Sequence, residues 1–177
     1  MDKKLLKMIY AAVCLALALV LPFLTGSLPQ IGRMLSPMHI PVLLAGYLCG
    51  GPLGAAVGFV APLLRSLLFG APVLFPNAVG MAFELAAYGF FVALFYKILP
   101  KKTGYLYLGL LASMVIGRLV WGGVRFLIAG LTATEFPFSA FLAGAVLDSI
   151  PGIIAVLILV PLLVLALRRA HLMPDQG

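Results

Sequence analysis

A few polar side chains that could bind a ligand or carry charge lie inside long apolar stretches of this sequence. Three of them, together with one methionine, fall at positions i, i+4, i+7 and i+11, so a helix would carry all four residues on one face. An ionisable group in such a setting is costly to bury and is a functional hypothesis by default. We therefore expect this face to turn toward the interior of a helical bundle. The four residues are Asn77, Met81, Glu84 and Tyr88.

Arginine outnumbers acid among the polar residues of these stretches. Arg65, Arg118 and Arg125 are basic, whereas only Glu84 and Asp148 are acidic. One positive charge is left over, and a planar guanidinium grips a carboxylate or a phosphate with two hydrogen bonds. The surplus predicts a binding site for a small anion. The alternative interpretation is a structural Arg–Asp pair with one arginine reaching toward the membrane surface, and Arg118 could serve either role.

The predicted binding site combines these residues with their neighbours. Trp121 shares a helical face with Arg118 and Arg125, and His39 begins another apolar segment. Together with Phe126, the tryptophan would supply an apolar wall for a small or medium-sized molecule. The predicted substrate-binding residues are His39, Arg65, Asn77, Met81, Glu84, Tyr88, Trp121, Arg125 and Asp148.

Catalysis would need a different set of groups. An enzyme within the membrane would require paired carboxylates, a Ser–His pair or a metal cluster. Only Glu84 and Asp148 could form such a pair, and His39 has no second ligand at metal-binding spacing. The sequence therefore predicts no enzyme, no metal and no cofactor, and an intramembrane enzyme using the two carboxylates is the less favoured alternative. A stand-alone secondary transporter of a small organic anion is the other, although no internal repeat is visible.

Composition places these residues in a membrane protein. The chain has 177 residues, of which 64% are hydrophobic and 10% are charged, whereas about a quarter of the residues in a soluble domain are charged. A membrane-spanning helix takes roughly 20 apolar residues, so the chain has room for about six spans. We expect residues 1–177 to form a single membrane domain, without a soluble catalytic or nucleotide-binding domain.

The apolar stretches predict an all-α integral membrane protein, a compact bundle of six transmembrane helices. Gly46, Gly50, Gly54 and Gly58 recur at four-residue spacing, which lets helix backbones approach closely in lipid. The second helix is too short to cross the bilayer unless its neighbours thin the membrane or share the crossing. The predicted helices cover about 5–24, 39–49, 53–69, 76–99, 105–131 and 138–167.

The net charge of +7 is concentrated at the ends of the predicted helices. If the chain crosses six times, eight of the twelve basic residues lie on one side, and positive residues favour the cytoplasmic side. We therefore expect both termini to be cytoplasmic, and a lipid bilayer rather than a nucleic acid to be the environment that these charges meet. The eight residues are Lys3, Lys4, Lys7, Lys97, Lys101, Lys102, Arg168 and Arg169.

Several short segments, in this order and spacing, carry a resemblance to a known family. Ala12 and Ala16 form an A-x-x-x-A pair in the first helix, and a proline-bearing outer loop leads into HIPVLLAGYLCGGPLGAAVGF. PLLRSLLFG and AFELAAYGF follow. Over nearly its whole length the chain resembles the substrate-binding S components of energy-coupling factor (ECF) transporters for vitamins.

The resemblance implies a function and a set of partners. Such a component binds one vitamin from outside and then associates with a transmembrane coupling subunit and two cytoplasmic ATPases, in the cytoplasmic membrane of a bacterium or an archaeon. Ala12 and Ala16 would lie on the face that meets the coupling subunit, and the loop Thr25–Met38 would cover a pocket that opens outward. Among the family's substrates the arginine surplus favours an anionic one, with pantothenate as first choice. Folate, riboflavin and a pyridoxine-type vitamin remain open.

Overall fold

A computed structural model describes residues 2–24, 37–145 and 149–173 of the chain. Within these ranges every regular element is helical, which confirms the predicted all-α class. A short helical turn, η1 (Leu74–Ala78), precedes the helix α5 (Val79–Ile98). The helices are α1 (Lys3–Leu24), α3 (His39–Cys49), α4 (Gly51–Phe69), α5 (Val79–Ile98), α6 (Thr103–Thr132), α7 (Phe138–Ala145) and α8 (Ile150–Arg169).

In the part of the chain that the structure describes, five helical segments are long and apolar enough to cross a membrane. The remaining apolar helix, α3, has 11 residues and at a rise of about 1.5 Å per residue covers roughly half of a hydrocarbon core. Five of the six predicted spans therefore have the length of a crossing, and α3 is the short one. The five segments are Lys3–Phe23, Gly51–Phe69, Leu74–Ile98, Thr103–Thr132 and Phe138–Arg169.

The last predicted helix, 138–167, is described in two parts. Helices α7 and α8 lie on either side of residues outside the described ranges, and the segment Phe138–Arg169 as a whole has the length and composition of a membrane span. Pro151 lies in the first turn of α8, where its missing N–H leaves no helical hydrogen bond unmade.

Glycines bring α3, α4 and α5 into backbone contact. A Cβ atom at Gly54 would lie 2.7 Å from the Cα of Gly46 and 2.8 Å from the carbonyl oxygen of Gly89. A Cβ atom at Gly58 would overlap the carbonyl group of Leu85. Only glycine leaves room for these approaches, as the four-residue spacing predicts. The turn between α3 and α4 also requires glycine, because Gly50 has a φ of 92°, where a side chain is strained.

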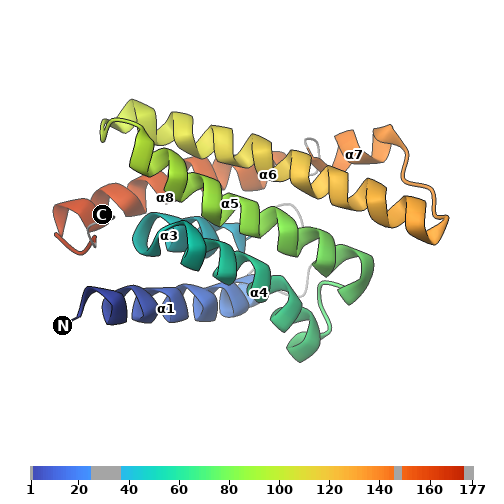
Figure 1. Ribbon diagram of the computed structural model, residues 1–177, viewed down its shortest axis with the longest axis horizontal. Helices are drawn as coiled ribbons and strands as arrows, with labels where there is room; N and C mark the ends of the chain where they lie inside the picture. Colours follow the sequence, from blue (N-terminus) through green and yellow to red (C-terminus); the bar gives the residue numbers. More distant parts are fainter. Residues whose placement is uncertain (1, 25–36, 146–148, 174–177) are drawn as a thin grey trace.

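Helix α5 lies at the centre of the bundle. It packs against α3, α4 and α6, while α1 covers α3 and α4, and α8 contacts α3 and α6. Figure 1 shows both chain ends at one end of the bundle, together with the turn between α5 and α6. The predicted even number of crossings requires that arrangement, and the side of the membrane that this end faces stays a prediction. The largest fully buried side chains include Leu43, Tyr47, Leu85, Tyr88 and Leu110.

Polar contacts fasten the end of α8 to the turn between α5 and α6. Arg168 donates from Nε to the hydroxyl of Tyr96 at 2.9 Å and from a terminal nitrogen to the carbonyl of Lys101 at 3.0 Å. Lys101 Nζ donates to the carbonyl of Tyr96 at 2.9 Å. Burial, and then the nearby Arg168, lower the pKa of Lys101. The C-terminal part of the chain is thereby held against the middle of the chain.

Candidate functional site

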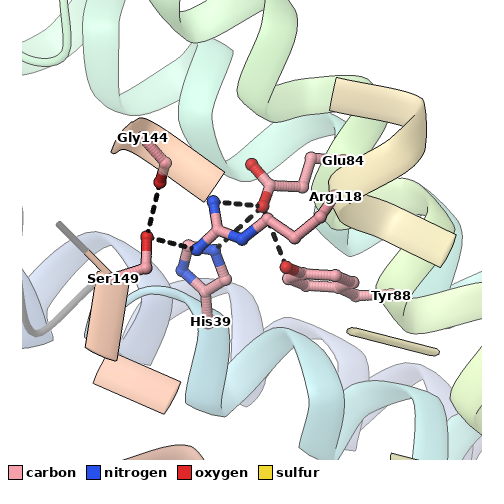
Figure 2. Close-up of polar contacts among 6 residues, drawn as sticks. All are labelled: His39, Glu84, Tyr88, Arg118, Gly144 and Ser149. Atoms are coloured by element: carbon pink, nitrogen blue, oxygen red, sulfur yellow. Dashed lines mark hydrogen bonds and ion pairs between the residues drawn. The ribbon is translucent and has the colours of Figure 1, made fainter. Parts of the chain in front are cut away.

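Glu84 is the centre of a buried polar cluster. Helix α5 places it in the bundle interior, where the residue is 1% exposed, as its helical face predicts. Its Oε1 lies 2.9 Å from a terminal nitrogen of Arg118 and accepts a hydrogen bond from the Tyr88 hydroxyl at 2.9 Å. His39 Nε2 is 3.7 Å from the same oxygen. Figure 2 shows the three side chains converging on this carboxylate.

Arg118 extends the cluster from α5 to the junction of α7 and α8. Its other terminal nitrogen donates to Ser149 Oγ at 2.8 Å, and that hydroxyl donates to the carbonyl of Gly144 at 2.8 Å. In Figure 2 the guanidinium lies between Glu84 and Ser149. A continuous line of polar contacts therefore joins α3, α5, α6 and the α7–α8 junction. Because the carboxylate balances the arginine, this geometry favours a structural role for Arg118.

A second polar group lies seven residues further along α6. Arg125 donates to Asn77 Oδ1 at 3.1 Å, and its guanidinium carbon lies 4.9 Å from the centre of the Phe136 ring. Its buried Nε has no hydrogen-bond partner among the described residues. Arg125 and Trp121 both lie against Gly80 of α5, where an added Cβ atom would be 3.3 Å from the arginine Cδ and 3.4 Å from the indole. Within the described chain no carboxylate pairs with this arginine.

Aromatic rings surround this second group. Trp121 stacks on Phe141 with ring centres 6.1 Å apart and meets the edge of Phe136 at 5.9 Å. Phe126 lies 5.1 Å from Phe136. These rings come from α6, the segment after it and α7, so they enclose the guanidinium of Arg125 on one side. A half-buried positive charge beside an apolar wall is suited to an organic anion, since the guanidinium can bind a carboxylate in a bidentate manner.

The structure places the predicted binding residues in separate groups. The buried cluster contains His39, Glu84 and Tyr88. The second group contains Asn77, Trp121 and Arg125. Met81 is half-buried and makes no polar contact among the described residues. Asp148 lies outside the described residues, and so does nearly all of the predicted covering loop Thr25–Met38. Substrate binding by each of these residues stays a prediction.

Arg65 lies in a third place. It is 8% exposed and donates to the carbonyl oxygen of Leu19 in α1. Its guanidinium carbon lies 4.7 Å from the Phe23 ring and 5.4 Å from the Phe69 ring. These contacts join α1 to α4, and in the described chain Arg65 has no polar contact with either group above. The geometry thus supports a packing role for this arginine, and its predicted contact with substrate has no support from these contacts.

Three residues that the sequence analysis did not select take part in these groups. Ser149 bridges Arg118 to the α7–α8 junction, and Phe136 and Phe141 form the aromatic wall. Two signals could have identified them. Pro151 favours the first turn of a helix and so places Ser149 at a helix N-terminus, and phenylalanines at 136, 138 and 141 follow the end of α6 closely.

Two further predictions concern metal binding and the coupling face. Within the described residues no group of three His, Cys, Asp or Glu side chains comes together that could hold a metal ion.

On α1, Ala12 and Ala16 lie on the exposed face, whereas Ala11 and Ala18 face the core. The predicted contact of Ala12 and Ala16 with another subunit is therefore sterically open, and it stays a prediction.

Comparison with known proteins gives one match. A family model described as the substrate-specific component of ECF transporters matches residues 6–164. The matched range takes in both polar groups and nearly all of the described helices. No curated protein and no solved structure matches the chain.

Proposed function

The chain belongs to the family of substrate-specific components of ECF transporters, and from this premise we propose that it captures a small organic anion outside the cell for uptake. Membership of this family makes the protein a substrate-binding component of a transporter rather than an enzyme. Its five long apolar helices agree with a membrane protein. What remains to be proposed is the substrate, the residues that bind it and the partners.

The observation that carries the choice of an anion is the environment of Arg125. Its only described polar partner is the neutral amide of Asn77, at 3.1 Å, so its charge is not balanced by a described carboxylate. Arg118, in contrast, is paired with Glu84 at 2.9 Å. An unbalanced, half-buried arginine is costly to keep in a membrane protein unless a ligand supplies the negative charge. A substrate carboxylate on Arg125 would meet that need.

Pantothenate is our first choice among the vitamins that such components transport. It is a small molecule with a single carboxylate, which matches one unbalanced guanidinium, and its apolar carbons would face Trp121 and Phe136. Folate, riboflavin and a pyridoxine-type vitamin are the alternatives, and each would bring an aromatic ring system to the same wall, whereas pantothenate is acyclic.

The proposed partners follow from the family. We propose that the protein works in the cytoplasmic membrane of a bacterium or an archaeon, with a transmembrane coupling subunit and two cytoplasmic ATPases. The exposed face of α1 around Ala12 and Ala16 would meet the coupling subunit. The end of the bundle that carries both termini would face the cytoplasm, in keeping with the eight basic residues assigned there.

The first prediction tests substrate binding by Arg125. Mass spectrometry of small molecules that co-purify with the protein should identify an organic anion, and Arg125→Ala should lower the affinity for it by roughly thirtyfold or more, since the bound anion loses a charged partner. Arg125→Lys keeps the charge but loses the bidentate hydrogen bonding of the guanidinium, so it should retain part of the affinity. Isothermal titration in detergent measures each value.

Arg169→Ala is the matched control, because this arginine is exposed at the end of α8 and should leave the affinity unchanged. Equal affinities for the wild type and Arg125→Ala would move the anion site elsewhere. A co-purified cation or neutral molecule would contradict the choice of an anion while leaving the family membership intact.

A further inference from the structure

We propose that the protein carries a second binding site, for the phosphate headgroup of an anionic phospholipid. The site is a cavity of about 270 Å³ between the start of α1, the turn joining α3 to α4, and the end of α5. Figure 1 shows these three segments toward the end of the bundle that carries both chain termini. The proposal does not depend on which substrate Arg125 binds.

Two lysines from different helices line this cavity. Lys7 reaches it from α1 and Lys97 from the last turn of α5. Neither lysine forms an ion pair with a carboxylate of the described residues. Two ammonium groups that line one cavity without a described carboxylate partner produce a positive potential that an anion would relieve. Basic pockets between helices at the membrane surface bind phospholipid headgroups.

Part of the cavity lining comes from the glycine turn between α3 and α4. Gly50 and Gly51 line it, and nothing lies within 4 Å of the place where a Cβ atom of Gly50 would be. Gly51 is also the first residue of α4, and the first N–H groups of a helix have no acceptor within the helix. The N–H of Gly51 is therefore a donor that suits a phosphate oxygen, whereas the N–H of Gly50 already donates to the carbonyl of Gly46 at 3.1 Å.

The apolar wall indicates a lipid rather than a free ion. Phe90 and Leu94 of α5 line the same cavity, and Phe90 is 41% exposed on the outer surface of the helix. A lipid could place its phosphate between the lysines and lay its acyl chains against this surface. The lysine stems can extend along the apolar helices while their charges remain at the membrane surface. Inorganic phosphate would use the charges but not the wall.

Native mass spectrometry of the full chain in detergent tests the assignment with phosphatidylglycerol, with phosphatidylcholine of the same acyl chains, and with inorganic phosphate. The wild type should prefer phosphatidylglycerol. Lys7→Gln with Lys97→Gln should weaken that binding by about fivefold for each lysine removed. Lys7→Arg with Lys97→Arg keeps both charges and should keep the preference.

The control is Lys4→Gln with Arg169→Gln, which removes two exposed charges that do not line the cavity. It should leave the affinity for phosphatidylglycerol within about twofold of the wild type. Equal losses in the control and the cavity variant would overturn the site, because the effect would then be net charge alone. Equal binding of both lipids would overturn it too, as would binding of inorganic phosphate as tight as that of phosphatidylglycerol. If the true ligand of these lysines were an acidic segment of a partner protein, the isolated chain would bind both lipids equally.

Discussion

At the scale of single residues, the three arginines in apolar helices have three different kinds of partner. Arg118 pairs with the Glu84 carboxylate, Arg65 donates to a backbone carbonyl and lies over two phenyl rings, and Arg125 bonds to an amide. Their charges are therefore stabilised to different degrees. The Glu84–Arg118 pair should therefore contribute most to the stability of the fold. Arg125, whose partner is only an amide, should contribute most to the affinity for an anionic ligand.

The second prediction concerns the ion pair of Glu84 and Arg118. Glu84→Gln or Arg118→Met alone should lower the free energy of unfolding by about 3 kcal/mol, because each leaves a buried partner uncompensated. The double variant should be less destabilised than the sum of the two, with a coupling of about 2 kcal/mol. Unfolding of the purified protein in mixed detergent micelles measures all three.

Glu135→Gln is the matched control for this cycle, since Glu135 is exposed after the end of α6. It should change the free energy of unfolding by less than about 0.5 kcal/mol. Strict additivity of Glu84→Gln and Arg118→Met would show that the two side chains do not act as a pair.

Residue-level prediction from sequence succeeded for Glu84 and was less successful for the arginines. A lone glutamate on a helix face with Tyr88 had to face the interior, because lipid offers it no partner. The prediction was wrong for Asn77, which was expected on the same interior face but is exposed and lies in η1. The count of charges could not distinguish the arginines, since a backbone carbonyl such as that of Leu19 is an acceptor that no residue count reveals. Only the packing of α1 on α4 brings that carbonyl to Arg65.

At the scale of elements, the contact of α4 with α5 depends on glycine. The third prediction is that Gly58→Ala lowers the free energy of unfolding by about 2 kcal/mol, because the added methyl would overlap the Leu85 carbonyl and the two helices would have to separate. Thermal unfolding monitored by circular dichroism measures the change. Gly123→Ala is the control within α6, where nothing lies within 4 Å of the new methyl group.

The control should be neutral or stabilising by up to about 1 kcal/mol, because alanine favours a helix over glycine. A similar destabilisation by both substitutions would mean that helix propensity, and not the α4–α5 contact, governs the result.

The sequence predicted most elements because apolar length and glycine spacing are local signals. It placed α1, α3 and α4 to within a few residues, and it foresaw the close approach of the glycine-rich helices. The hydrogen bond from Arg118 to Ser149 was not foreseen, because it joins two helices across 31 positions of the sequence and no local pattern reveals it.

At the scale of the whole molecule, the exposed face of α1 is the surface that the proposed partners would use. The fourth prediction is that Ala12→Leu with Ala16→Leu weakens association with the coupling subunit by roughly thirtyfold, since extra bulk at a close helix contact costs about 2 kcal/mol. Uptake by cells should fall while substrate affinity of the isolated protein is retained. Co-purification with the coupling subunit and uptake of labelled substrate measure the two effects.

Two substitutions bracket this result. Ala166→Leu places the same bulk on the exposed face of α8 and should leave uptake unchanged, whereas Ala18→Leu enters the core of the bundle, where Ala18 is 0% exposed, and should destabilise the protein itself. Loss of substrate binding in Ala12→Leu with Ala16→Leu, with normal unfolding, would contradict the assignment of this face to a partner.

The backbone contact of α4 with α5 also has a use beyond stability. The atoms nearest to the Cβ positions of Gly58 and Gly89 are backbone atoms of the facing helix, which cannot change rotamer, so the pair should keep its separation throughout a transport cycle. Spin labels or fluorophores attached to the lipid-facing sides of this hairpin would then report a constant distance. Distances from this pair to labels on the other helices could then be measured during uptake. A change in one of these distances would identify the helix that moves.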